Sequence, residues 1–182
     1  YQPPGVWEAV AMPESNTRNY QMDSGNNLYR RSMYTFWKRA APPASMDVFN
    51  APNREVCTIR RERTNTPLQA LAALNDTQMV EAARVLAQQM VAEINSGKLS
   101  ESEAMDELSW RLLARAWSPA ERVIVATTWQ RLVSQFLEHR EGASHLVRVG
   151  EWPVTDGLDE VQVAAWTMLI NQLLNLDEFL NK

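Results

Sequence analysis

The chain offers little thiol or imidazole chemistry. Its 182 residues include one cysteine, Cys57, and two histidines, His139 and His145. A single cysteine excludes an intramolecular disulfide, a multi-thiolate metal site and an iron–sulfur cluster. The histidines stand six residues apart with Gly142 between them, too sparse a set to make a metal site. We therefore predict no metal ligands and no cofactor in this chain.

Long apolar runs and recognisable catalytic patterns are missing too. No stretch approaches the roughly 20 apolar residues that a bilayer span requires, and none has the flanks of a signal peptide. Neighbouring acids such as Asp106 and Glu107 diverge on a helix, and Ser144 beside His145 lacks the glycines of a nucleophile elbow. The sequence predicts no membrane span and no catalytic residue.

What the chain does contain is enough apolar material for a core. Apolar residues make up 45% of the sequence and include seven tryptophans and eight methionines, while 22% of residues are charged. A chain of this length buries roughly 70% of its unfolded surface when it folds. The composition is typical of a globular protein of one domain, or of a domain with an attached segment.

Charge is distributed unevenly along the chain. Residues 28–66 carry eight basic and three acidic side chains, a net charge of +5, whereas the rest carries −9, for a total of −4. Two interpretations remain open: the segment is a basic surface for an anionic partner, or it docks onto the acidic helices of the chain itself.

The first third of the chain has few helix signals. Prolines recur through it, and residues 28–39 mix aromatic, β-branched and charged side chains in a pattern that fits a helix or a strand equally. We expect residues 1–66 to form an irregular basic and aromatic segment that packs on a helical bundle of residues 67–182. Together the two parts are predicted to make one domain, a fragment of a longer parent.

Helix start signals become clear from Thr66 onward. Three capping boxes pair an N-cap hydroxyl with a Glu or Gln three residues later: Thr66 with Gln69, Ser100 with Glu103, and Ser118 with Glu121. Asp76 is a further N-cap. These signals predict helices over residues 67–74, 77–94, 101–116, 119–138 and from about 158, with Gly142 ending the fourth.

Apolar residues recur at helical spacing in the longer predicted helices, which predicts one buried face for each. The predicted stripes are Met79, Ala83, Leu86, Met90 and Ile94; Met105, Leu108, Leu112 and Ala116, widened by Trp110, Leu113 and Trp117; Val125, Trp129, Leu132 and Phe136; and Ala165, Leu169, Leu173, Leu176 and Leu180. The predicted fold is mainly α, an irregular bundle of about five helices with an extended, loop-rich N-terminal third.

Long parts of the sequence resemble a known family. The strings YQPPGVWE, YRRSMYTFWKRAAPPASMDVFNAPNREVCTIRRERTNTPLQALAALND and AAWTMLINQLLNLDEFL resemble the planctomycete-type C-terminal family catalogued as domain of unknown function 1553, in its C-terminal half. The resemblance implies an extracytoplasmic location, periplasmic or secreted, and a cytochrome c-like domain upstream in larger members. Because this chain has no Cys-x-x-Cys-His, covalent haem attachment is not expected in it.

The resemblance leaves the function open, and two hypotheses follow. The first is a non-catalytic structural or interaction module of an extracytoplasmic, cytochrome-associated protein, in contact with the upstream domains of its parent. The second is part of an enzyme, redox or hydrolytic, that acts on extracellular carbohydrate and is completed by upstream residues. The overall acidity disfavours nucleic acid as a partner. A cytochrome c-like domain and an anionic glycan are the remaining candidates.

Candidate binding residues all lie in the basic segment: Arg30, Arg31, Trp37, Arg60, Arg61 and Arg63. We favour a structural role for them, with the arginines as internal struts that bond carboxylates or carbonyls, and with Tyr34, Phe36 and Trp37 packed as core. The alternative is an exposed surface that binds anions or stacks on sugar rings. Cys57 is expected to be buried, because Val56 and Ile59 beside it are apolar.

Overall fold

The computed structural model describes residues 5, 7–8, 11–16, 18–19, 21–39 and 41–181. The chain divides into two compact units, Tyr1–Ala72 and Ala73–Lys182, which are called unit 1 and unit 2 below. The expectation that residues 1–66 and 67–182 together form one domain stays a prediction.

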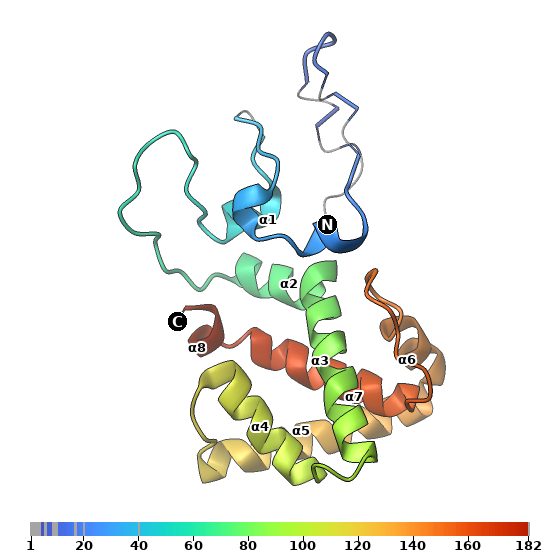
Figure 1. The fold of residues 1–182 in the computed structure, drawn as a ribbon. Coiled ribbons are helices and arrows are strands. Elements are labelled where there is room, and N and C mark those ends of the chain that lie inside the picture. Colours follow the sequence, from blue (N-terminus) through green and yellow to red (C-terminus); the bar gives the residue numbers. More distant parts are fainter. Residues whose placement is uncertain are drawn as a thin grey trace. The chain divides into compact units, whose positions relative to one another are not determined.

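Unit 1 is largely irregular, as expected. Its described residues form two 3-10 helices, η1 (Gly25–Tyr29) and η2 (Ser32–Tyr34), one short α-helix, α1 (Ala44–Val48), and the beginning of α2 (Pro67–Asn75). The segment that could have been helix or strand thus forms short 3-10 turns. Pro42 and Pro43 precede α1, and residues 49–66 between α1 and α2 have neither helix nor strand (Figure 1).

The start of α2 shows the predicted capping box. The backbone N–H of Thr66 donates to Gln69 Oε1 at 2.9 Å, and the backbone N–H of Gln69 donates to Thr66 Oγ1 at 3.2 Å. Two helix-terminal donors are thereby satisfied reciprocally. Pro67, the first helical residue, has no N–H to satisfy.

Unit 2 is helical, which confirms the predicted mainly α fold. Its helices are α3 (Thr77–Asn95), α4 (Glu101–Leu113), α5 (Pro119–Glu138), α6 (Arg140–Leu146), α7 (Glu160–Leu174) and α8 (Asp177–Leu180). The caps follow the sequence signals: Asp76 accepts from Gln78 N–H at 2.8 Å, and Ser100 and Ser118 both form complete capping boxes. The short helices α1, α6 and α8 were not expected from the sequence.

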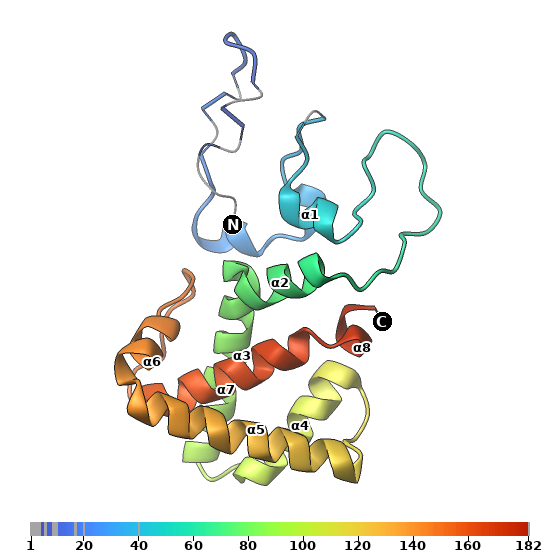
Figure 2. The same ribbon diagram turned by 180° about the vertical axis from the view of Figure 1, so that it is seen from behind.

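Helix α7 is the centre of unit 2. It packs against α3, α5 and α6, and in both views it runs between α3 and α5 (Figures 1 and 2). Eleven of its residues are buried, including Val163, Trp166, Leu169, Ile170 and Leu173. A helix that is apolar all round belongs inside a fold, so α7 is a core element and the single predicted stripe describes only part of it.

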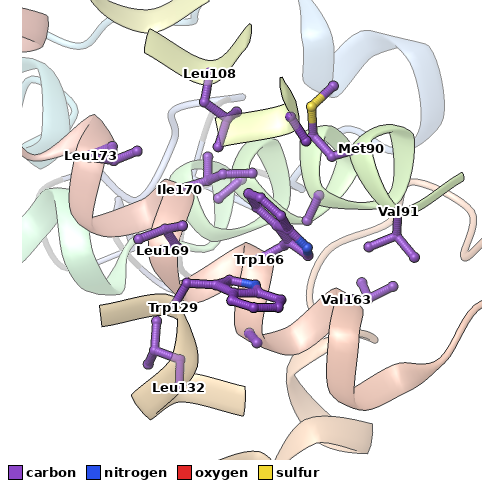
Figure 3. Packing of buried hydrophobic residues seen from close by; sticks show 14 of the residues in the cluster. Met90, Val91, Leu108, Trp129, Leu132, Val163, Trp166, Leu169, Ile170 and Leu173 are labelled. Carbon is purple, nitrogen blue, oxygen red and sulfur yellow. The ribbon is translucent and has the colours of Figure 1, made fainter. Parts of the chain in front are cut away.

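The core around α7 is built from all the long helices of unit 2. Trp166 is fully buried and lies beside Trp129 of α5, with ring centroids 5.7 Å apart and planes tilted by 45° (Figure 3). Met90 of α3 and Leu108 of α4 are likewise fully buried. The predicted inward positions of α3 and α5 are buried or partly buried in this cluster.

Several predicted boundaries and faces are wrong. Helix α4 ends at Leu113, because Ala114 adopts a left-handed conformation with φ of 57°, and Ala116 beyond it is exposed. Trp110, on the far side of α4 from the core stripe, is 58% exposed. Gly142 lies inside α6 and does not end α5, which stops at Glu138. Leu176 is exposed at the N-cap of α8, after a break that follows α7.

One arginine ties three helices of unit 2 together. Arg115, just after α4, forms bidentate pairs with two carboxylates: its Nη2 lies 2.8 Å from Glu121 Oε1 in the first turn of α5, and 2.8 Å from Glu178 Oε2 in α8. The bond from Arg115, together with the bonds from the backbone N–H and hydroxyl of Ser118, lowers the pKa of Glu121 from 4.5 to about 2.

This depressed pKa predicts acid sensitivity. A carboxylate whose pKa is lower in the folded chain stabilises the fold above its ordinary value of 4.5, and that stabilisation is lost as the pH falls from 4.5 to about 2. Glu121→Gln keeps a capping-box side chain but cannot ionise. We expect this variant to lose less stability than the unchanged chain between pH 6 and pH 2, in urea unfolding followed by circular dichroism. Glu138→Gln, at the other end of α5, is the control, and an acid response equal to that control would contradict the prediction.

Candidate functional site

The most deeply buried charges of the described chain lie on α3. The side chains of Glu81 and Arg84 are 3% and 0% exposed, one helical turn apart. Arg84 Nε donates to the carbonyl of Val149 at 3.0 Å, and its Nη2 donates to the carbonyl of Trp152 at 2.6 Å. Glu81 Oε1 accepts from the backbone N–H of Trp152 at 2.5 Å. The two charges therefore hold the segment between α6 and α7 against α3.

Gly150 makes this close approach possible. Its φ of +89° is a conformation that side chains rarely adopt, and a Cβ at this position would lie 2.4 Å from the Glu81 carboxyl carbon. Residue 150 must therefore be glycine for Glu81 to reach the backbone of Trp152. We call Glu81, Arg84 and Gly150 the α3 tie. The α3 tie was not predicted from the sequence, although a Glu and an Arg within the apolar pattern of α3 were a usable signal.

The other buried polar side chains of the described residues also serve the fold. Gln88 of α3 accepts from Thr155 Oγ1 at 3.4 Å, and Asn171 of α7 donates to the carbonyl of Ala73 at 3.2 Å. Ser109 and Thr167 donate to backbone carbonyls of their own helices. These bonds go to backbone atoms or to neighbouring polar side chains, as expected of polar groups that stabilise a core.

The predicted binding arginines of unit 1 lie at the surface. Arg30, Arg31, Arg60, Arg61 and Arg63 are all exposed. Within the part of the chain that the structure describes, their guanidinium groups have no hydrogen bond and no ion pair. The strut hypothesis also included partners on the acidic helices, and it stays a prediction that unfolding measurements can test.

Two other arginines of unit 1 do act as struts. Arg54 Nη2 donates to the carbonyl of Ser32 at 3.2 Å, and the guanidinium of Arg54 lies 4.8 Å from the ring centroid of half-buried Trp37. Arg39 forms an ion pair with Glu55. These contacts bring residues 32–39 beside the start of the connection between α1 and α2.

That connection is a loop held at its base. Asn50 Nδ2 donates to Thr64 Oγ1 at 2.6 Å, and the buried amide of Gln69 donates to Thr64 Oγ1 at 2.8 Å and to the carbonyl of Val48 at 2.9 Å. We call residues 51–63 the clamped loop (Figure 1, between α1 and α2). A loop of this length with closed ends is uncommon in compact proteins and is frequently functional.

The outer part of the clamped loop is fully open to solvent. Residues 52–63 are all exposed, and Ile59 reaches 103% exposure. From Val56 to Arg63 the backbone and side chains make no hydrogen bond with the described residues. Residues 56–63 therefore present three arginines and two large apolar side chains, Val56 and Ile59, on a backbone with free donors and acceptors.

The aromatic residues near η2 do not pack as predicted. Tyr34 is 66% exposed and Phe36 is also exposed, although the Phe36 ring lies edge-on to the buried Trp7 ring with a centroid distance of 5.1 Å. A helix of three residues has no face wide enough to bury several aromatic rings, so only Trp37 of this group is partly covered.

The prediction that Cys57 is buried is wrong. Cys57 is exposed, as are its apolar neighbours Val56 and Ile59. Apolar neighbours in sequence bury a residue only if the segment belongs to a helix or strand with a core-facing side. The clamped loop has no such side.

No group of three or more His, Cys, Asp or Glu side chains that could hold a metal ion occurs among residues 21–39 and 41–181 or the other described positions. His145 Nε2 lies 3.8 Å from Glu141 Oε1 on the exposed side of α6. None of the helices described here is long and apolar enough to cross a membrane.

Comparison with known families gives one match. The model of the family PSD1, described as protein of unknown function (DUF1553), matches residues 4–135. The chain belongs to this family. The match includes the clamped loop, α3, α4 and most of α5, while α6, α7 and α8 lie beyond it. No curated protein and no solved structure matches the chain.

Proposed function

We propose that the chain is a non-catalytic interaction module of an extracytoplasmic, cytochrome-associated protein, and that its basic segment binds an anionic partner. The observation that carries the proposal is the exposure of five guanidinium groups, those of Arg30, Arg31, Arg60, Arg61 and Arg63. They have no partner among the described residues, so their charges and donors are available to a ligand.

Guanidinium chemistry indicates the class of ligand. Arginine presents a planar fork of donors that matches carboxylate and sulfate groups bidentately. Arg60, Arg61 and Arg63 stand close together in the clamped loop, and exposed Tyr34 near Arg30 and Arg31 offers an aromatic face for a sugar ring. An anionic glycan therefore fits the surface better than a neutral one.

The non-catalytic part of the proposal is supported by the buried polar groups. Glu81, Arg84, Gln88, Ser109, Thr167 and Asn171 are all engaged in bonds that hold segments of unit 2 together. Each of these side chains makes at least one bond within the fold, whereas the five guanidinium groups of Arg30, Arg31, Arg60, Arg61 and Arg63 face solvent.

The location and the neighbours rest on the family resemblance. Larger proteins with this C-terminal region resemble secreted or periplasmic proteins that have a cytochrome c-like domain upstream. A module of this kind would position the upstream domains of its parent at an anionic surface. The cytochrome c-like domain itself is the other candidate partner.

Binding to immobilised heparin, a sulfated glycan, tests the proposal. We expect the unchanged chain to bind heparin and to be released by salt, because exposed charges are screened at high ionic strength. A variant with Arg30, Arg31, Arg60, Arg61 and Arg63 changed to Gln should bind roughly tenfold more weakly or worse, since exposed charge pairs contribute about 0.2–1 kcal/mol each. Neutral dextran is the ligand control.

A matched protein control uses exposed arginines of unit 2. Arg131→Gln combined with Arg140→Gln removes positive charge outside the basic segment and should retain binding. The free energy of unfolding of the five-arginine variant should lie within about 0.5 kcal/mol of that of the unchanged chain. Losses of about 3–5 kcal/mol for Arg31→Met, Arg61→Met or Arg63→Met would instead support buried struts and contradict the proposal.

A further inference from the structure

We propose that the clamped loop is a processing site for an arginine-specific endoprotease of the trypsin class, with the bond between Arg60 and Arg61 as the point of cleavage. This inference does not depend on the proposed function. It rests on the backbone of residues 56–63 and on the position of the arginines in it.

A protease needs a substrate segment that can enter its active site in extended form. Such segments bind as an added strand, with their backbone groups bonded to the enzyme and alternate side chains in pockets. Residues 56–63 meet this requirement without local unfolding, because they are exposed and make no hydrogen bond with the described part of the chain. Arginines within helices, such as Arg111 and Arg131, become available only when a helix opens.

The side chains around the bond select it within the loop. An arginine-specific pocket carries a carboxylate that pairs with the guanidinium of the residue before the cleaved bond. Cleavage after Arg61 is disfavoured because the carboxylate of the next residue, Glu62, is repelled by such an acidic pocket. Cleavage after Arg63 is disfavoured because the next residue, Thr64, is held by hydrogen bonds from Asn50 and Gln69. Arg60 has the fully exposed Ile59 before it and no such restraint after it.

The reaction is an ordinary peptide hydrolysis. Water adds to the carbonyl carbon of Arg60 and the bond to the nitrogen of Arg61 breaks. Arg60 is left with a new carboxylate and Arg61 with a new ammonium group. Arg30 and Arg31 then belong to a different fragment from Arg61 and Arg63.

Limited digestion of the native chain with trypsin, followed by mass spectrometry of each cleaved bond over time, tests the proposal. We expect cleavage after Arg60 to be about tenfold or more faster than cleavage after Arg111, Arg122 or Arg131, because the helical sites wait for local opening. Slower or equal cleavage in the clamped loop would overturn the proposal. So would a faster cut after Arg61 or Arg63 than after Arg60.

A pair of variants separates the site from general instability. Arg60→Gln should abolish the fastest cut within the loop while leaving the thermal midpoint unchanged, since the side chain is exposed. Arg18→Gln, which removes an exposed basic residue of unit 1 outside the loop, should leave cleavage after Arg60 at its original rate. Loss of the cut in both variants, or in neither, would contradict the assignment.

Discussion

Replacing Trp166 by alanine should lower the free energy of unfolding by about 3–5 kcal/mol. Trp166 is fully buried at the centre of α7 and packs beside Trp129. Removal of the indole takes away a large apolar surface and leaves a cavity lined by helices on several sides, which can collapse only in part. Chemical denaturation followed by far-ultraviolet circular dichroism measures the change.

Trp110→Ala is the matched control for this prediction. The same side chain is removed from α4, but Trp110 is 58% exposed, so we expect a loss below about 1 kcal/mol. The contrast between the two tryptophans tests the placement of α7 at the centre of unit 2. Similar losses for both variants would show that the burial pattern is different from the one described here.

The Arg84→Met variant should be destabilised by about 3–5 kcal/mol, because it leaves the Glu81 carboxylate buried without its cation. The change also removes the bonds to the carbonyls of Val149 and Trp152, so the segment between α6 and α7 loses two of its ties to α3. Methionine fills much of the same volume, so most of the effect comes from charge and hydrogen bonding. Denaturant unfolding is the measurement.

Arg131→Met is the control, since Arg131 is exposed on α5 and should change stability by less than about 0.5 kcal/mol. A double variant, Glu81→Gln with Arg84→Met, should be less destabilised than Arg84→Met alone, because no unpaired charge remains. If the double variant is as unstable as Arg84→Met, the loss of stability comes mainly from the missing hydrogen bonds to the carbonyls of Val149 and Trp152, and not from the unpaired carboxylate of Glu81.

Helix starts were the most predictable part of the fold. The capping boxes at Thr66, Ser100 and Ser118 depend on residues within one turn of each other, so local sequence is enough to identify them. Helix α5 has both predicted bounds, Pro119 and Glu138. Helix ends were less predictable: the left-handed turn at Ala114 has no glycine to announce it.

Features that depend on tertiary contacts were not predictable in this way. The burial of α7 comes mainly from its contacts with α3, α5 and α6, although the lack of charged residues from Val161 to Leu174 was a clear signal of it. The α3 tie joins residues about 70 positions apart, and no local pattern links Glu81 to Trp152.

The candidate site was predicted in part. The charge asymmetry identified the basic segment, and the arginines of this segment are exposed. Sequence alone did not identify the base of the clamped loop, because the side-chain bonds that join Asn50, Thr64 and Gln69 span 14 and 5 positions. Without that closure, the apolar neighbours Val56 and Ile59 were the only guide to Cys57, and they wrongly indicated that it is buried.

The clamped base also has a consequence for variation in chain length. Because Asn50, Thr64 and Gln69 already hold the two ends together, residues added between them extend a loop that is closed in any case. Doubling the length of such a loop costs only about 0.6 kcal/mol in closure entropy. The chain should therefore accept a peptide inserted beside Ile59 without loss of the surrounding fold.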